Sequence, residues 1–207
     1  FGTGASIARS FAIYNTGTSA LTISSITVDG TNASEFVVID APSTIAAGSN
    51  ATFTVTFSTS TFGVLRTATI HVNNTDCNEG DYDFAVQAAL PHYSITTTGG
   101  ALSIVDNAGN AQTLTASQSG SNIRFVVTPA PATATYAING GAMTAFTTPA
   151  DIALAGLTSI TIYAGDGADN ITFGAFSTPL PSLSVNGGIA SDLVTFNGDI
   201  SFASGAN

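Results

Sequence analysis

The stretch Ala51-Thr-Phe-Thr-Val-Thr-Phe57 decides the fold class of this chain. Its apolar residues, Phe53, Val55 and Phe57, fall on one face of an extended strand, and the threonines between them fall on the other. This alternation predicts an antiparallel strand that turns one face to a hydrophobic core and the other to water.

The same period of two recurs in the segments Arg66-Thr-Ala-Thr-Ile-His-Val72 and Asp81-Tyr-Asp-Phe-Ala-Val86. Phe11 and Ile13 also share one face of an earlier strand, before the turn at Asn15-Thr-Gly17. The residues that we expect to point into the core are Ala68, Ile70 and Val72 in the first segment, and Tyr82, Phe84 and Val86 in the second.

Six or seven such strands fit into the first ~90 residues, which is the strand spacing of a two-sheet sandwich. Leu21 and Ile23 follow one phase, whereas Ile26 and Val28 follow the other. The phase therefore changes at Ser24-Ser25, where we expect a β-bulge or a bend of the strand between sheets.

A different pattern starts near residue 160, after a boundary that we place at residues 91–92. Apolar pairs recur there, and every second pair is separated by 23 residues. Asp169 and Asp192 are also 23 residues apart. Such a period predicts a β-solenoid from about residue 157, whose coils bury their apolar faces by stacking. Two coils are few for stability, so we expect the chain to continue beyond Asn207. The apolar pairs are Ile160/Ile162, Ile171/Phe173, Leu183/Val185 and Val194/Phe196.

The composition is apolar and poor in charge. Hydrophobic residues make up 44% of the 207 residues and charged residues 8%, and the formal net charge is −10. Three arginines are the only Lys or Arg residues, so the field of the chain repels nucleic acids. No apolar run reaches the ~20 residues of a membrane-spanning helix. We expect an extracellular or cell-surface protein that neither binds nucleic acid nor inserts into membranes.

Residues 1–90 resemble the bacterial Ig-like domains called choice-of-anchor D, which are related to the ASH/Hydin group. The resemblance lies in Phe1-Gly-Thr3, in Arg9-Ser-Phe-Ala-Ile-Tyr-Asn-Thr-Gly17 and in Thr52-Phe-Thr-Val-Thr-Phe57. It implies an Ig-like sandwich over residues 1–91 that serves as an interaction or spacer module, without catalytic residues. Members of the family usually have a further strand before the Phe-Gly-Thr motif, so one sheet edge is expected to be open to strand addition by a neighbour.

Residues 92–207 are similar to the start of β-helical regions in large bacterial surface proteins and adhesins. The likeness lies in Leu157-Thr-Ser-Ile-Thr-Ile162 and in Val194-Thr-Phe-Asn-Gly-Asp-Ile-Ser-Phe-Ala-Ser-Gly205. It implies a second, β-rich domain that begins a parallel β-helix.

Two acidic segments are candidate calcium sites. Gly165-Asp-Gly-Ala-Asp-Asn-Ile171 resembles one half of a calcium-binding β-roll repeat, with Asp166 and Asp169 as ligands. The alternative is that these aspartates hydrogen-bond the amides of their own turn, which we favour because the motif is not repeated in tandem.

The second acidic segment is the loop that holds Asp76, Glu79 and Asp81 beside Cys77, the only cysteine. Its acids lack a recognisable calcium register, so we expect a solvated loop, with a calcium site as the alternative. A single cysteine forms no disulfide within the chain, and we expect a free thiol.

The sequence contains no motif for catalysis or for a cofactor. His71 lies on the outward face of its strand and His92 in the linker, and neither belongs to a nucleophile motif. We therefore expect a non-enzymatic structural module, namely a spacer, filament or adhesin segment, which contacts other modules or copies of itself through edge strands. A module that binds carbohydrate or another surface ligand is the first alternative, and a β-helical polysaccharide-degrading enzyme is the second.

Overall fold

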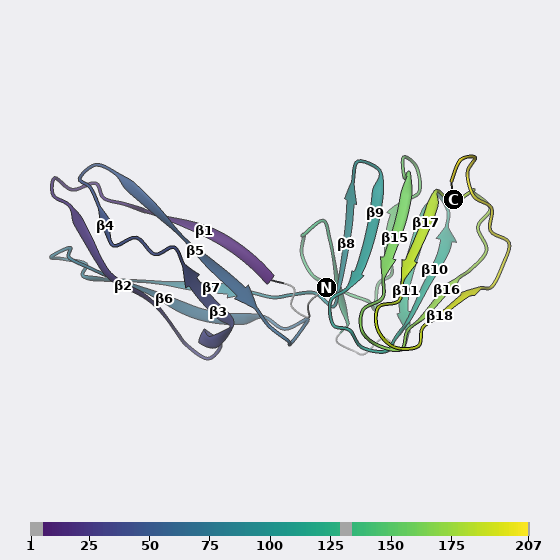
Figure 1. Cartoon of the computed structure of the whole chain (residues 1–207), viewed down its shortest axis with the longest axis horizontal. Helices are drawn as coiled ribbons and strands as arrows, with labels where there is room; N and C mark the ends of the chain where they lie inside the picture. The colour runs from purple at the N-terminus through teal and green to yellow at the C-terminus, as the bar shows by residue number, and fades with distance from the viewer. Residues whose placement is uncertain (1–5, 129–133, 207) are drawn as a thin grey trace. The chain divides into compact units, whose positions relative to one another are not determined.

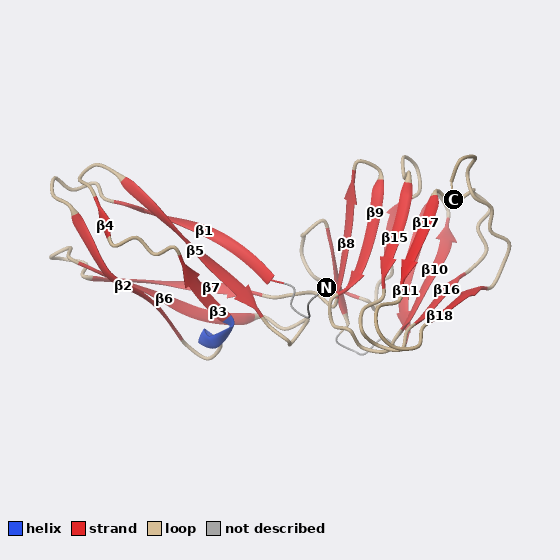
Figure 2. Cartoon of the chain, in the orientation of Figure 1, coloured by secondary structure: helices blue, strands red, loops and turns tan. Residues whose placement is uncertain are grey.

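The computed structural model of the chain describes residues 6–128 and 134–206. In these residues the chain forms 18 strands in four sheets, and its one helix is the three-residue 3-10 turn η1 (Ala33–Glu35) (Figure 2). The all-β class expected from the sequence is confirmed. The described residues divide into two compact units. The first holds residues 6–60 and 64–90, and the second holds residues 61–63, 91–128 and 134–206.

The first unit consists of seven strands in two antiparallel sheets (Figure 1). The three-stranded sheet has the order β1-β5-β3, and the four-stranded sheet has the order β4-β2-β6-β7. The strands are β1 (Ser6–Tyr14), β2 (Leu21–Asp29), β3 (Phe36–Ile39), β4 (Thr44–Ile45), β5 (Asn50–Ser58), β6 (Arg66–Asn74) and β7 (Asp81–Ala88).

The core of the first unit lies between these two sheets. The phenyl rings of Phe11 in β1 and Phe84 in β7 are 5.2 Å apart, so the two sheets face each other. The inward residues predicted for the central strands β5 and β6 are buried, which confirms both patterns. They are Phe53, Val55 and Phe57 in β5, and Ala68, Ile70 and Val72 in β6.

The predicted phase change in β2 is confirmed as a β-bulge. Ile23 pairs with Asn74, and Ser25 pairs with Asn73, so one extra residue is inserted in β2 between these pairs. Because of the extra residue, odd-numbered residues point to the core before the bulge and even-numbered residues point to the same core after it.

The second unit consists of eleven strands in two mixed sheets (Figure 1). The six-stranded sheet has the order β13-β12-β8-β9-β15-β17, and the five-stranded sheet has the order β14-β11-β10-β16-β18. The strands are β8 (Tyr93–Thr98), β9 (Ala101–Asp106), β10 (Thr113–Ser119), β11 (Asn122–Thr128), β12 (Thr135–Ile138), β13 (Thr144–Ala145), β14 (Ala150–Ala153), β15 (Ser159–Tyr163), β16 (Asn170–Phe173), β17 (Ser182–Asn186) and β18 (Leu193–Phe196).

Three repeats form the centre of the second unit, and each places one strand in the six-stranded sheet and the next strand in the five-stranded sheet. The first repeat is β9 and β10, the second is β15 and β16, and the third is β17 and β18, and equivalent strands pair in parallel. Ile160 pairs with Leu183 and Ile171 with Val194, which confirms the 23-residue register for the second and third repeats. The first repeat was not recognised in the sequence, because β11 to β14 are inserted between it and the second.

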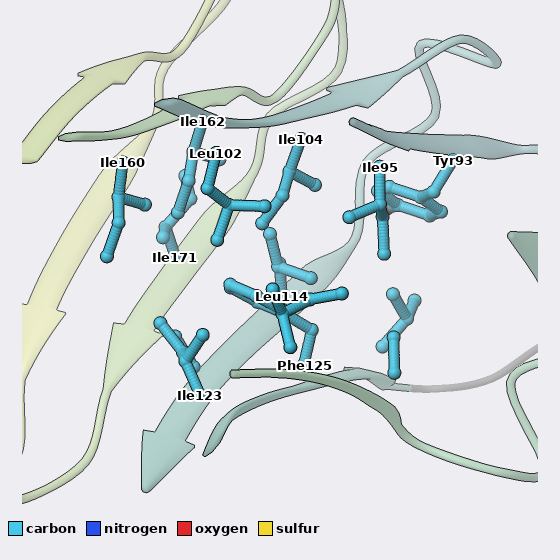
Figure 3. Packing of buried hydrophobic residues seen from close by; sticks show 14 of the residues in the cluster. Tyr93, Ile95, Leu102, Ile104, Leu114, Ile123, Phe125, Ile160, Ile162 and Ile171 are labelled. Carbon is cyan, nitrogen blue, oxygen red and sulfur yellow. The ribbon is translucent and has the colours of Figure 1, made fainter. Parts of the chain in front are cut away.

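The inward residues of both sheets meet in one continuous apolar core (Figure 3). Ile95, Ile104 and Ile160 from the six-stranded sheet and Phe125 and Ile171 from the five-stranded sheet are almost completely buried. The third repeat is more exposed, since β17 and β18 pair on one side only in the described part of the chain.

Candidate functional site

A groove of about 450 Å³ opens between the edge strands β1 and β7 of the first unit. Its floor contains Ile23, Phe53 and Val72, which belong to the core between the two sheets. β1 lines the groove with four consecutive residues, 11–14, whereas β7 contributes only the alternate residues Tyr82 and Phe84. Consecutive residues along one side indicate that the main-chain edge of β1 follows the groove.

Neither edge strand is fully covered by the rest of the unit. No residue of β1 or β7 is buried, although their neighbours β5 and β6 each contain three buried apolar residues. The expected burial is therefore wrong for Tyr82, which is 48% exposed. Phe84 and Val86 lie on the inward face as expected, but they are only half-buried. Alternation along a strand identifies its apolar face, but burial also requires a strand opposite that face.

Aromatic rings give the groove its apolar surface. Phe11 packs on Phe53 with ring centroids 5.5 Å apart and on Phe84 at 5.2 Å, and Tyr82 lies 6.1 Å from Phe84. Tyr14 is 69% exposed. The groove is thus a half-exposed aromatic surface beside a sheet edge that no other described strand covers, which is an arrangement found at interaction sites.

The acidic loop between β6 and β7 lies at the groove, where Asn74, Asp76 and Glu79 are among the lining residues. The Asn74 side chain orders this loop, because its Nδ2 donates to the Glu79 carbonyl at 2.9 Å and its Oδ1 accepts from the Asp76 amide at 2.8 Å. The calcium candidates Asp76 and Glu79 therefore place negative charge at the groove. Cys77 is exposed and free, as expected.

Asp81, the third acid predicted with that loop, belongs to another group. In the described residues, the only three potential metal-binding side chains with ligand atoms within 4.8 Å of one another are His71, Asp81 and Asp83. His71 pairs directly across from Asp83 in the sheet, and its Nδ1 lies 2.6 Å from Asp83 Oδ1. The sequence could not reveal this group, because it depends on the register between β6 and β7.

The two aspartates of the predicted calcium turn have different positions. Asp166 is exposed, whereas Asp169 is buried with 5% exposure. Asp169 Oδ1 accepts a hydrogen bond from the Gln112 amide at 2.9 Å, and Asp192 Oδ1 accepts one from the Asp169 amide at 3.0 Å. The expected bonding of Asp169 within its own turn is therefore wrong, because its carboxylate reaches the preceding repeat.

Buried acidic and aromatic residues near this turn were missed in the sequence. Asp106 is 6% exposed and Tyr93 is 3% exposed, and the two pair directly across β8 and β9. An acid at the end of an apolar strand in phase with its inward residues was the available signal, since Leu102 and Ile104 precede Asp106 on the same face.

The second histidine lies in the second unit, close to a threonine. His92 Nδ1 is 3.1 Å from Thr135 Oγ1, and burial lowers the pKa of His92. The contact with Thr135 gives the ring a structural hydrogen-bond partner.

No protein-family profile, curated protein or solved structure matches this chain. Among the described residues, no helix is long and apolar enough to cross a bilayer.

Proposed function

We propose that this chain is a non-enzymatic structural and adhesive segment of the cell exterior, and that its first unit binds an extended polypeptide strand in the groove. The observation that carries this proposal is the apolar groove beside the outer edge of β1, which pairs with no strand among residues 6–128 and 134–206. Strand addition to such an edge combines main-chain hydrogen bonds with apolar side-chain contacts.

The finer architecture belongs to the same proposal. Seven antiparallel strands in two facing sheets support an Ig-like sandwich of the choice-of-anchor D kind for the first unit. Parallel pairing of three repeats supports a short β-solenoid for the second. Both architectures suit spacers, since β-ladders and stacked cores hold a fixed length.

The incoming strand pairs with β1 rather than β7. β7 carries Asp81 and Asp83, and charges on an edge strand oppose pairing with another strand. β1 carries a single charged residue, Arg9, which lies outside the groove-lining residues. The four consecutive residues that β1 offers to the groove provide the hydrogen-bonding groups for the ligand.

The groove also defines the chemistry of the incoming strand. Its apolar lining requires apolar side chains at alternate positions of the ligand, because only one face of an added strand points inward. Asp76 and Glu79 favour a Lys or Arg residue at the part of the ligand that lies beside them. This chain has no Lys, and two of its three Arg residues, Arg66 and Arg124, already form ion pairs with Glu35 and Asp151. A partner protein with a basic, alternating segment therefore fits better than a second copy.

Fluorescence anisotropy with a designed peptide tests this proposal. The peptide has nine residues, as β1 has, alternates valine with threonine and carries lysine at both ends. Two further peptides are N-methylated at alternate residues, one in each phase. Strand addition predicts that the parent binds and that only one methylated peptide fails, because only one set of amides faces β1.

Two matched protein variants locate the site. Ile13→Lys places a charge in the groove and is expected to abolish binding, whereas Val37→Lys alters β3, the opposite edge of the same sheet, and is expected to leave binding unchanged. Thermal unfolding confirms that both variants are folded. Absence of binding by the parent peptide, or equal binding of both methylated peptides, contradicts strand addition.

A carbohydrate-binding groove is the second candidate function. The exposed rings of Tyr14 and Tyr82 and the polar groups of Asn74 and Asp76 favour it, since sugars stack on aromatic rings and bond to polar side chains. A glycan array distinguishes the two functions. Glycan binding that Tyr82→Ala abolishes supports this second candidate, whereas peptide binding that is lost on N-methylation in one phase only supports strand addition, because only strand addition uses the β1 main chain.

A further inference from the structure

The outer face of the four-stranded sheet brings one histidine and two aspartates together. His71 in β6 pairs directly with Asp83 in β7, and Asp81 lies two residues before Asp83 on the same strand. Residues two apart in a strand point to the same face, so all three side chains stand on one side of the sheet. This side is turned away from the groove, because the alternate residues Tyr82 and Phe84 line the groove.

The potential ligand atoms of these three side chains converge. One donor atom from each side chain lies within 4.8 Å of the donor atoms of the other two. His71 Nδ1 is 2.6 Å from Asp83 Oδ1 and 4.0 Å from Asp81 Oδ2. Two ligand atoms of one tetrahedral zinc ion lie about 3.3 Å apart, because each bond to the ion is about 2.0–2.1 Å long. An ion therefore fits once the Asp83 oxygen moves away from the imidazole, and the Asp81 oxygen toward it, by about 0.7 Å each.

The sheet allows this small adjustment. The side chain of His71 is 25% exposed, whereas those of Asp81 and Asp83 are 54% and 51% exposed. The histidine is thus held by its neighbours, and the two carboxylates can move without disturbing the core. The backbone below them is fixed, because β6 and β7 pair in an unbroken register over this region.

No arginine of the described chain neutralises these two aspartates. Arg66 forms its ion pair with Glu35 at 3.4 Å, and Arg9 lies in the other sheet, where its Nη1 donates to the Ala8 carbonyl. The contact between His71 and Asp83 provides one close partner for two carboxylates on the same face. Two negative charges at this spacing repel each other, and a cation bound between them removes the repulsion.

We propose that a zinc-class divalent ion binds to His71 Nδ1, Asp81 Oδ2 and Asp83 Oδ1, with water as the fourth ligand. One imidazole nitrogen and two carboxylate oxygens suit zinc, whereas calcium takes six to eight oxygen ligands. The ion takes the place of the proton between His71 Nδ1 and Asp83, and the imidazole keeps its other proton on Nε2. The bound ion ties the edge strand β7 to β6 on the outer face of the sheet. The site shares no side chain with the groove, so this inference stands or falls independently of strand binding.

Isothermal titration calorimetry of the intact chain with zinc chloride at pH 7.5 provides the first test. We expect one ion per chain, and we expect His71→Ala and Asp83→Asn each to weaken binding by about tenfold or more. Cys77→Ser is the first control, because Cys77 is an exposed thiol in the preceding loop and thiolates bind zinc. Asp29→Asn is the second control, at an exposed aspartate of the same sheet. Both controls are expected to bind zinc as the wild type does.

The imidazole nitrogen resonances provide a readout at the level of the residue, because the chain has only two histidines. Zinc is expected to shift the Nδ1 resonance of His71 and to leave His92, in the second unit, unchanged. Zinc is also expected to raise the unfolding temperature of the wild type and of Cys77→Ser but not of Asp83→Asn. Absence of binding at millimolar zinc overturns the proposal, as does binding that Cys77→Ser abolishes and His71→Ala leaves unchanged.

Discussion

Asn15 is the buried polar residue that fixes the first turn of the chain. Its Nδ2 donates to the carbonyls of Ser19 at 2.8 Å and Ile45 at 3.0 Å, and its Oδ1 accepts from the Gly17 amide at 3.0 Å. The side chain is 7% exposed, so water cannot replace these bonds if it is removed.

We expect Asn15→Ala to lower the free energy of unfolding of the first unit by about 2 kcal/mol, because it leaves buried backbone groups unpaired. Urea unfolding measures the change. Asn78→Ala, at an exposed asparagine in the loop before β7, is the control and is expected to have little effect. Equal stability of the two variants would show that the Asn15 bonds contribute nothing net.

The ion pair of Arg124 and Asp151 gives the second unit a defined acid dependence. The hydrogen bond from Arg124 lowers the pKa of Asp151, so the folded state holds this carboxylate in its charged form more strongly than the unfolded state does. The stabilisation is present above the unfolded pKa of about 3.9 and is lost as the pH falls through the lower folded value.

We therefore expect Asp151→Asn to destabilise the second unit at pH 7. Near pH 2 we expect the variant and the wild type to unfold at the same denaturant concentration. Chemical denaturation at several pH values checks this result. Because the side chains of Arg124 and Asp151 are 39% and 32% exposed, high salt is expected to reduce the difference at pH 7. A difference that persists unchanged at pH 2 would assign the effect to packing.

For single residues, the sequence predicted the orientation of side chains better than their hydrogen-bond partners. The inward direction of Phe53 and Ile70 follows from strand alternation alone, and both are buried. The hydrogen bond between Asp169 and the Gln112 amide spans 57 residues, so no local pattern could indicate it. Asp106 was not predicted to be buried, because a single acidic residue after an apolar run is usually taken to mark the exposed end of a strand.

Among the elements, the edge strands decide where the first unit binds. The alternating pattern of β7 is as regular as that of β6, yet β6 is buried and β7 is half-exposed. The difference arises because β6 has a strand on each side and β7 only on one. Strand order is not encoded in periodicity, so the groove became visible only in the structure.

The turns between the sheets of the second unit depend on close backbone approach. A Cβ on Gly167 would collide with the backbone of Ala111 in the preceding repeat, whereas a Cβ on Gly174 would make an ordinary contact at 3.4 Å with Ser117. Stacking of the two loops therefore requires glycine at position 167.

We expect Gly167→Ala to destabilise the second unit by about 1–3 kcal/mol, because the loops have to move apart. Gly174→Ala is the matched control in the same repeat and is expected to change stability little. Differential scanning calorimetry compares the two. An unchanged unfolding temperature for Gly167→Ala would mean that the loops are less tightly stacked than the structure indicates.

The whole molecule consists of two units with separate cores. Phe53 is 2% exposed in the first unit and Phe125 is completely buried in the second. Each unit is compact and has its own hydrophobic interior, which is the property of an independently folding domain.

We expect calorimetry to show two unfolding transitions. Phe53→Ala should lower the unfolding temperature of the first unit only, and Phe125→Ala that of the second unit only. Each substitution creates a cavity in one core and should reduce the free energy of unfolding of that unit by about 3–5 kcal/mol. A single transition that both substitutions shift would show that the two units unfold together.

At the scale of the chain, the sequence predicted the fold class and the 23-residue repeat, but not the extent of the repeat. The second and third repeats are contiguous, so their apolar pairs are visible as a period. The first repeat is separated from them by four inserted strands, and Leu102 and Leu114 therefore appeared unrelated to Ile160 and Ile171. An insertion interrupts the sequence period of a repeat, but the pairing of its strands in the structure still shows it.

The proposed binding of a strand at β1 is tested most directly by amide hydrogen exchange of Ser6–Tyr14 with and without the alternating peptide. Binding by strand addition predicts slower exchange at alternate amides of β1 and no change in β3 at the opposite edge of the sheet. Exchange in β1 that the bound peptide leaves unchanged would contradict strand addition and leave the groove as a side-chain surface only.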